Sequence, residues 1–178
     1  MKKPSKPFDE KERLDNLRSY ELLDTESEPD FDEITELIGL ICNCPIALIS
    51  LVDQNRQWFK AKIGLTANET DRDISFCGHA ILQTGIFEIE DARTDHRFSD
   101  NPLVVNEPYV IFYAGCPIIT VEKKAVGTLC VIDHKPRKLD EKQKRSLVIL
   151  ANQVGRQMYL RKQNKTLQTL YTSMFSDG

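Results

Sequence analysis

The chain has 178 residues, of which 40% are hydrophobic and 29% are charged, a balance typical of a globular protein with one hydrophobic core. Its net charge of −3 gives no basic excess for nucleic-acid binding, and no apolar run approaches the roughly 18 residues of a membrane-spanning helix. We therefore expect a cytoplasmic protein with reduced cysteines, no nucleic-acid partner and no membrane insertion.

The first part of the chain predicts a lead-in and two helices. Residues 1–7 contain two prolines and three lysines and are expected to be mobile. Residues 8–23 carry apolar side chains at three-residue steps, which indicates a helix. Ser27 is expected to cap a second helix, which Pro45 ends. The apolar face of this second helix is predicted to comprise Phe31, Ile34, Leu37, Ile38 and Ile41.

Two β-hairpins are predicted in the middle of the chain. Residues 46–52 are almost continuously apolar, which is typical of a strand buried on both faces, and residues 57–63 follow after a polar turn. Residues 112–121 and 125–132 repeat this arrangement. Because helices precede and follow the hairpins, the order of elements indicates an α+β fold with a central antiparallel sheet.

A polar insertion separates the two hairpins. We expect a short helix over residues 76–83, with Ser75 as its N-cap, and a short strand over residues 87–89. Residues 94–105 are expected to be irregular. The insertion therefore holds the most reactive side chains of the chain in one segment between two sheet-forming regions.

From Leu139 onward the pattern predicts one long helix that carries a heptad seam. The seam residues follow one another at steps of four, three, four and three, and they are Leu160, Asn164, Leu167, Tyr171 and Met174. A polar residue at one core position fixes the register and strand number of a coiled coil, so Asn164 favours a dimer seam. The alternative is an asparagine that faces solvent on a monomeric helix.

Seven blocks of the sequence resemble the GAF domains found N-terminal to bacterial diguanylate cyclases and sensor histidine kinases. In order they are LDT at 23–25, ISLVD at 49–53, RQWFK at 56–60, SFCGHAI at 75–81, DAR at 91–93, FYAG at 112–115 and GTLCVID at 127–133. The resemblance covers residues 15–160. It leaves residues 1–14 as a lead-in and the start of a helix, and residues 161–178 as an extension of a signalling and dimerisation helix.

The resemblance implies an α/β/α-like sandwich around an antiparallel sheet of five or six strands. The N- and C-terminal helices would pack on one face of the sheet, and a ligand pocket would lie on the other. The resemblance also implies dimerisation through the terminal helices. The candidate ligand-binding residues are Ser75, Phe76, Cys77, His79, Asp91, Arg93, Phe98, Phe112 and Tyr113.

Cys77 carries the sharpest chemistry among these candidates. In the first turn of a helix capped by Ser75, the helix dipole would favour its thiolate, and His79 would add to this effect. Cys77 is therefore a candidate redox-sensitive thiol or ligand contact, and the alternative is a small buried core residue. Arg93 either clamps an anionic ligand or pins its loop by pairing with Asp91. The aromatic candidates either line an apolar cavity or belong to the core.

Three functions fit the sequence. The first is a small-molecule- or redox-sensing module of bacterial signal transduction, a homodimer without a required cofactor that relays to an output domain or partner protein. The second is a structural dimerisation domain without ligand, which Ile111 favours because similar proteins usually carry a basic residue there. The third is an enzyme similar to free methionine sulfoxide reductases, with Cys77 and Cys116 as the reacting pair. We expect no enzyme and no metal site, since the histidines and cysteines lack ligand spacing.

Overall fold

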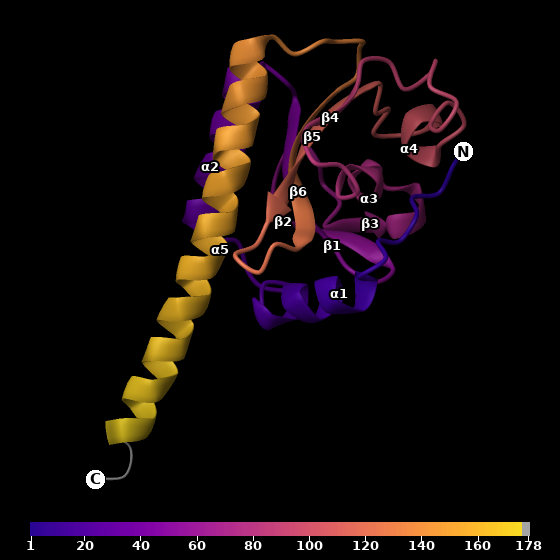
Figure 1. Cartoon of the computed structure of the whole chain (residues 1–178). Helices are drawn as coiled ribbons and strands as arrows, with labels where there is room; N and C mark the ends of the chain where they lie inside the picture. Colours follow the sequence, from indigo (N-terminus) through magenta and orange to yellow (C-terminus); the bar gives the residue numbers. More distant parts are fainter. Residues whose placement is uncertain (176–178) are drawn as a thin grey trace.

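A six-stranded antiparallel sheet forms the centre of the computed structural model, which describes residues 1–175 (Figure 1). In spatial order its strands are β3 (Glu69–Asp71), β2 (Arg56–Ile63), β1 (Ile46–Val52), β6 (Ala125–Asp133), β5 (Phe112–Ile119) and β4 (Phe87–Ile89). The antiparallel pairing of β1 with β6 joins the two predicted hairpins into one layer. This confirms the expected α+β fold and the six strands; only the short β3 was not predicted.

The alternation of side chains along the strands creates two apolar clusters, one on each face of the sheet. Every residue of β1 is buried, as expected for a strand covered on both faces. Within β1, Ile49 and Leu51 point toward the helices, whereas Leu48 belongs to the cluster on the opposite face. Because side chains alternate with a period of two, the same strands supply both the structural core and the floor of the candidate site.

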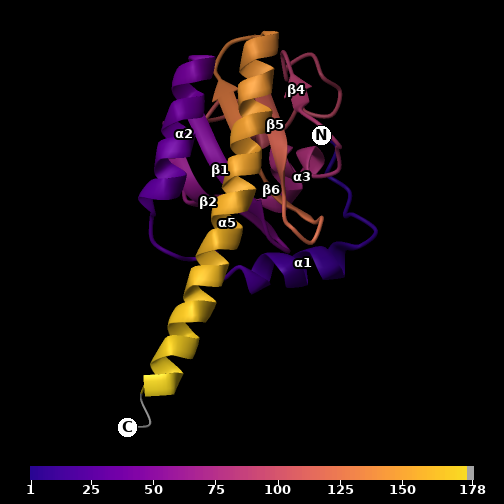
Figure 2. The same cartoon turned by 60° about the vertical axis from the view of Figure 1, so that its left-hand side comes forward.

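Helices α2 (Pro29–Cys42) and α5 (Glu141–Phe175) pack side by side on one face of the sheet, as expected (Figure 2). The first helix, α1 (Glu10–Ser19), lies across one end of the sheet (Figure 1). It is shorter than the predicted 8–23, because Phe8 is fully exposed and the backbone of Glu21 turns to positive φ.

The buried face of α2 differs from the predicted one. Phe31, Thr35, Ile38 and Cys42 are its buried residues, at steps of four, three and four, whereas the predicted Leu37 and Ile41 are exposed. Thr35 tolerates burial because its hydroxyl donates to the carbonyl of Phe31 at 2.9 Å. The expected cap at Ser27 is also wrong: the N-cap is Glu28, without a side-chain capping bond, and Pro29 begins the helix.

The segment between the hairpins, apart from its strand β4, covers the other face of the sheet as a roof, which we define as residues 71–111. It contains a 3-10 turn (Arg72–Ile74) and two short helices, α3 (Phe76–Ala80) and α4 (Pro102–Val105). Helix α3 is shorter than the predicted 76–83, and α4 lies in a stretch that was expected to be irregular. Both helices have a side-chain cap, from Ser75 and Asn101 respectively.

The long C-terminal helix α5 continues well past the sheet (Figures 1 and 2). Leu147, Ala151, Val154 and Met158 are buried against the core. The side chains of residues 163–174 are all exposed. No helix among residues 1–175 combines the length and the apolar character needed to cross a membrane.

Candidate functional site

The candidate site lies between α3 in the roof and the β1, β6 and β5 strands beneath it. Ser75 begins α3: its hydroxyl accepts a hydrogen bond from the Gly78 amide at 3.0 Å and donates to the Arg72 carbonyl at 2.7 Å. This capping is what the sequence predicted. It orients the next turn of the chain so that Phe76 and Cys77 point down onto the sheet, where both are buried.

The sulfur of Cys77 lies among hydroxyl groups of the sheet. Tyr113 of β5 donates to it at an O···S distance of 3.3 Å, and Thr128 of β6 donates at 3.1 Å. Cys130 of β6 belongs to the same buried cluster. Hydroxyl groups from two neighbouring strands thus converge on one thiol in an otherwise apolar cluster.

These donors change the acidity of Cys77. Burial, the largest single influence, raises the pKa of Cys77, but the hydrogen bonds together outweigh it and bring the pKa below its ordinary value. The neighbouring Cys77 thiol and burial raise the pKa of Cys130 well above its ordinary value. Of these two buried thiols, Cys77 is therefore the more acidic.

The physical source of this thiolate character differs from the expected one. Helix α3 has only five residues, so its dipole is small, and the hydroxyl donors of the sheet take its place. His79 does not assist either. Its Nε2–H donates to the carbonyl of Lys2 at 3.0 Å, and burial lowers the pKa of its imidazole.

Aromatic side chains pack tightly under the roof around this cluster. The rings of Phe76 and Phe98 stack with centroids 4.1 Å apart, and Phe76 also contacts Tyr113 at 5.2 Å. Phe87 and His79 pack against the same group. All five side chains are buried. Four predicted site residues, Phe76, His79, Phe98 and Tyr113, are thus brought together, and they form a packed core around the thiol.

The predicted lead-in lies along the roof as a strap, which we define as residues 1–7. The Lys2 amide donates to the Arg97 carbonyl at 2.9 Å, and Lys3 pairs with Asp73 at 2.6 Å. Pro4 lies against Gly78, where an added Cβ would come within 2.7 Å of the proline ring. The segment that we expected to be mobile thus makes defined contacts with the roof.

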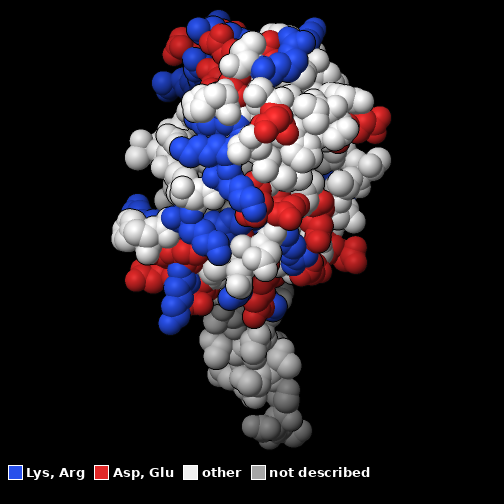
Figure 3. Space-filling model, turned by 90° about the vertical axis from the view of Figure 1, so that its right-hand side faces the viewer, with Lys and Arg blue, Asp and Glu red and all other residues white. Residues whose placement is uncertain are grey.

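Asp91 and Arg93 lie apart from Cys77 and bind one another. The guanidinium of Arg93 donates to both carboxylate oxygens of Asp91, at 2.9 and 2.7 Å, and its side chain is largely exposed. Asp95 and Arg97 repeat the same contact four residues later, at 2.9 and 2.6 Å. The geometry therefore agrees with the alternative in which Arg93 pairs with Asp91 and holds its loop in place. On this side of the molecule basic and acidic side chains are interspersed (Figure 3).

Phe112 and Cys116 lie on the opposite face of the sheet from Cys77. Both belong to the cluster that packs under α2 and α5, because Tyr113 faces the roof and its neighbours at odd steps face away. Phe112 is therefore not part of the site. Cys77 and Cys116 are separated by the sheet, so the reacting pair that we considered for a reductase does not exist.

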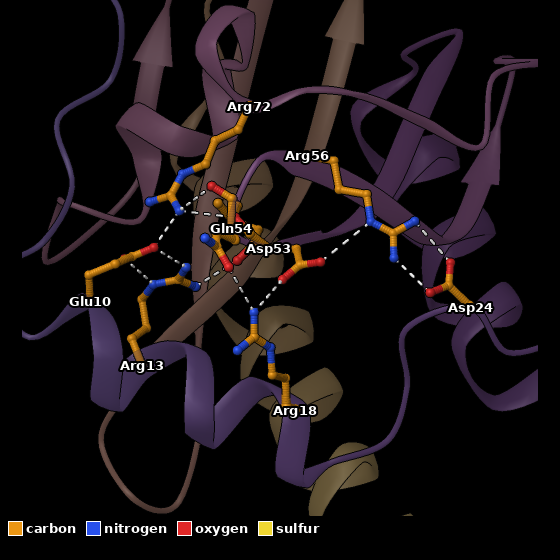
Figure 4. A network of polar contacts seen from close by, with 9 residues as sticks. Glu10, Arg13, Arg18, Asp24, Asp53, Gln54, Arg56 and Arg72 are labelled. Atoms are coloured by element: carbon orange, nitrogen blue, oxygen red, sulfur yellow. Dashed lines mark hydrogen bonds and ion pairs between the residues drawn. The ribbon is translucent and has the colours of Figure 1, made fainter.

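A buried ionic network that the sequence did not predict joins α1 to the turn after β1 (Figure 4). Arg13 donates to Glu10 at 2.8 Å and to the Val52 carbonyl at 2.8 Å. Arg72 binds the same Glu10 carboxylate and the carbonyl of Asp53. Because Arg13 and Arg72 are both buried, this network fixes the end of the roof next to α1.

A second polar cluster lies where α5 leaves the sheet. Glu28 accepts hydrogen bonds from the buried Lys60 and from Arg161, and Arg161 also donates to the carbonyls of Tyr20 and Glu21. A cleft of about 570 Å³ opens beside this cluster. Its lining includes Phe31, Leu160, Asn164 and Gln168. Two predicted seam residues thus border it.

Comparisons with known proteins agree with this geometry. The model of the GAF domain family matches residues 28–158. A cyclic di-GMP phosphodiesterase of Pseudomonas aeruginosa is 46% identical over 137 residues, which span 77% of this chain but only 23% of that protein. The chain thus corresponds to less than a quarter of this relative.

Solved structures show the same fold at low sequence identity. The GAF domain of an Acinetobacter phosphoenolpyruvate-protein phosphotransferase has a TM-score of 0.63 at 19% identity and covers 87% of this chain and 98% of its own. A free methionine-R-sulfoxide reductase of Neisseria meningitidis has a TM-score of 0.62 at 14% identity, covering 86% of this chain and 90% of its own. With the roof, the two-faced sheet and a family match over most of its length, the chain belongs to the GAF domain family.

Proposed function

We propose that the chain is a regulatory module of a bacterial signalling protein, which works without catalysis of its own. In this proposal it forms a homodimer through α5, reads a small molecule or a redox change at the roof, and passes the result to an output domain or partner protein. The relative from Pseudomonas aeruginosa supports this context, because its name is that of a signalling enzyme much longer than the matched segment.

The observation that carries the proposal is the dual role of helix α5. Its first half belongs to the hydrophobic core through Leu147, Val154 and Met158, and its second half leaves the sheet as the same unbroken helix. A helix transmits rotation and translation along its axis because its backbone is internally hydrogen-bonded. A change in sheet packing is thereby linked to the exposed end of α5.

The exposed half of α5 carries the predicted seam. Leu160, Leu167 and Met174 are more than half exposed, which is unusual for large apolar side chains that have no partner to cover them. Two heptads are too short to associate as isolated peptides. Here the core already holds the first half of α5 as a helix, so the entropic cost of starting the helix is not repeated in the seam.

The cluster around Glu28 supplies a route from the sheet to the seam. Lys60 projects from β2, Glu28 precedes α2, and Arg161 lies one residue after the first seam position. A signal needs two states with different affinity for the stimulus, and a shared carboxylate at the exit of α5 is a contact that such states would change.

A structural dimerisation domain without ligand is the second candidate. The close aromatic packing under the roof favours it, because Phe76 and Phe98 already occupy the space next to Cys77 that a bound molecule would take. Both candidates use the same dimer, and they differ in whether a stimulus at the roof changes it. A reductase-like enzyme lacks its reacting pair here, since Cys77 and Cys116 lie on opposite faces of the sheet.

Analytical ultracentrifugation of the 178-residue chain tests the dimer. We expect the wild type to associate reversibly and Leu167→Asp to raise the dissociation constant by about a hundredfold or more, because a charge at a central seam position is desolvated without a partner. Leu40→Asp is the matched control: Leu40 is as exposed as Leu167 but lies on α2. A wild type that remains monomeric at all concentrations, or equal weakening by both variants, excludes the α5 dimer.

A further inference from the structure

We propose that Cys77 and Cys130 form a redox-active dithiol beneath the roof, which a hydroperoxide converts into an intramolecular disulfide. The pair joins α3 to β6, so the reaction would draw the roof toward the central strand of the sheet. The signalling consequence rests on the function proposed above, whereas the chemistry of the pair stands on its own geometry.

The arrangement of the five cysteines singles out this pair. Cys77 and Cys130 belong to the same buried cluster beneath the roof, and the Cys77 sulfur lies 3.1 Å from the hydroxyl of Thr128, two residues before Cys130 on the same face of β6. Cys42 and Cys44 lie at the end of α2, and Cys116 lies on the far face of the sheet. A disulfide requires an S–S distance of about 2.05 Å, so the pair that shares one cluster is the one that a small movement of α3 can join.

The environment of the pair also suits nucleophilic chemistry. Tyr113 and Thr128 donate to the sulfur of Cys77 at 3.3 and 3.1 Å, and donors of this kind stabilise a thiolate. A buried cysteine that serves only as core packing is usually surrounded by apolar groups, which raise its pKa, as burial does for Cys116. Hydroxyl donors from neighbouring strands at one sulfur distinguish Cys77 from such a residue.

The reaction balances with a hydroperoxide as the only co-reactant. The Cys77 sulfur attacks the terminal oxygen of hydrogen peroxide, the O–O bond breaks, and one water leaves with the thiol proton, giving a sulfenic acid. The Cys130 sulfur then attacks the Cys77 sulfur, the S–O bond breaks, and a second water leaves with the proton of Cys130. Two thiols lose two electrons, and the peroxide is reduced to two molecules of water.

The strap controls access to the pair. Both sulfur-bearing side chains are buried, and residues 1–7 lie over the outer side of α3, with Pro4 against Gly78 and Lys2 bound to His79. Hydrogen peroxide is close in size to a water molecule, so a local opening of the strap and α3 is sufficient to admit it. Larger oxidants such as glutathione disulfide would be excluded by the same cover.

Peroxide treatment of the folded 178-residue chain, followed by alkylation and peptide mass spectrometry, tests the pair. We expect the wild type to lose two hydrogen atoms and to yield a peptide pair linked through Cys77 and Cys130. In Cys130→Ala the reaction stops at Cys77, where dimedone, added as the oxidised protein is unfolded, traps the sulfenic acid. Cys116→Ala is the matched control and retains the disulfide. Tyr113→Phe combined with Thr128→Val slows the oxidation of Cys77 by about tenfold at pH 7.

The proposal is overturned if peroxide treatment of the folded wild type leaves Cys77 and Cys130 as free thiols, which are alkylated once the protein is unfolded. It is likewise overturned if the disulfide forms only in urea. It is also overturned if Cys130→Ala yields no sulfenic acid while its thermal unfolding matches that of Cys116→Ala. The same samples are sedimented. An intact α5 dimer without a disulfide removes this inference alone, and a disulfide in a monomeric chain removes the dimer alone.

Discussion

Lys60 and Arg161 bind the same carboxylate, although one projects from the sheet and the other from the exit of α5. The ammonium of Lys60 lies 2.7 Å from Oε1 of Glu28, and Nε of Arg161 lies 2.9 and 3.0 Å from its two oxygens. The Lys60 side chain is 0% exposed, so Glu28 supplies the counter-charge of a fully buried cation. The loss of this carboxylate should lower the free energy of unfolding and also disturb the start of the seam.

Glu28→Gln tests this link. The amide keeps the size of the side chain and an oxygen acceptor but removes the charge, so Lys60 then has only neutral acceptors, which include the Thr25 hydroxyl and the Glu26 carbonyl. Removing one partner of a buried pair costs about 3–5 kcal/mol, and because Glu28 is partly exposed to water we expect roughly 1–3 kcal/mol. Urea denaturation followed by circular dichroism measures the change.

Glu26→Gln is the matched control for this substitution. Glu26 lies two residues away, is exposed, and forms no ion pair in the described part of the chain, so we expect a change within about 0.5 kcal/mol. Equal loss of stability in the two variants would mean that net charge near α2, rather than the bond to Lys60, is what matters.

Glu10 predicts how stability responds to acid. Burial opposes its ionisation, but hydrogen bonds from Arg13 and Arg72 outweigh burial and lower its pKa from 4.5 to about 2. Because the folded-state pKa is depressed, the stabilisation is complete above pH 4.5 and is lost as the pH falls toward 2. A tenfold change in proton affinity is worth about 1.4 kcal/mol, so the full effect is roughly 3 kcal/mol.

The difference in unfolding free energy between the wild type and Glu10→Gln measures this contribution. We expect the difference to be constant between pH 7 and pH 5 and to shrink steadily below pH 4.5. Glu12→Gln on the same helix, whose carboxylate is largely exposed, is the control and should change the unfolding free energy little. A difference for Glu10→Gln that stays constant down to pH 3 contradicts the proposed bond to both arginines.

Local patterns in the sequence were sufficient for the strands and the order of the layers. Apolar runs such as 46–52 and turn residues between them specify hairpins, and the resulting pairing of β1 with β6 follows from burying both faces. The ends and faces of helices were less predictable. In α2, Thr35 is buried because its hydroxyl bonds to the backbone of its own helix, whereas an apolar pattern assigns buried positions to Leu37 and Ile41.

The candidate site was located from the sequence but its chemistry was not. Cys77 was identified, yet its partners Tyr113 and Thr128 are 36 and 51 residues away, and only the fold brings them together. The separation of the two faces, in contrast, follows from the sequence. Tyr113 and Cys116 are three residues apart on one strand, so the period of two already places them on opposite faces.

Only glycine fits at position 127, because the neighbouring strand leaves no room for a side chain. Gly127 pairs with Leu51 across β1 and β6, and an added Cβ would lie 2.0 Å from the Ser50 carbonyl oxygen. The Ser50 and Leu51 atoms that this Cβ would meet belong to the backbone of β1, so they cannot move aside without separating β1 from β6. We expect Gly127→Ala to cost about 2–4 kcal/mol, measured by thermal and urea unfolding, and also to disturb the neighbouring Thr128.

Gly85→Ala provides the control for Gly127. An added Cβ at Gly85 meets no atom within 4 Å, so we expect unfolding within about 0.5 kcal/mol of the wild type. A tolerated alanine at Gly127 would show that β1 and β6 are not packed as closely as described.

His79 predicts a second, milder dependence on pH, well above the range where Glu10 titrates. Burial lowers the pKa of its imidazole below 6.5, while the bond to the Lys2 carbonyl opposes this change. The pKa of this base is lower in the folded state than in the unfolded chain, so the unfolded chain takes up the proton first as the pH falls. The stability of the fold is therefore greatest above pH 6.5 and decreases below it. We therefore expect the thermal stability of the wild type to decrease from pH 7 to pH 5.

His79→Gln, which keeps a donor for Lys2, should show a smaller decrease. His96→Gln should behave like the wild type, because His96 is 87% exposed. If His79→Gln and the wild type lose stability in parallel over this range, His79 is not held in its neutral form beneath the strap.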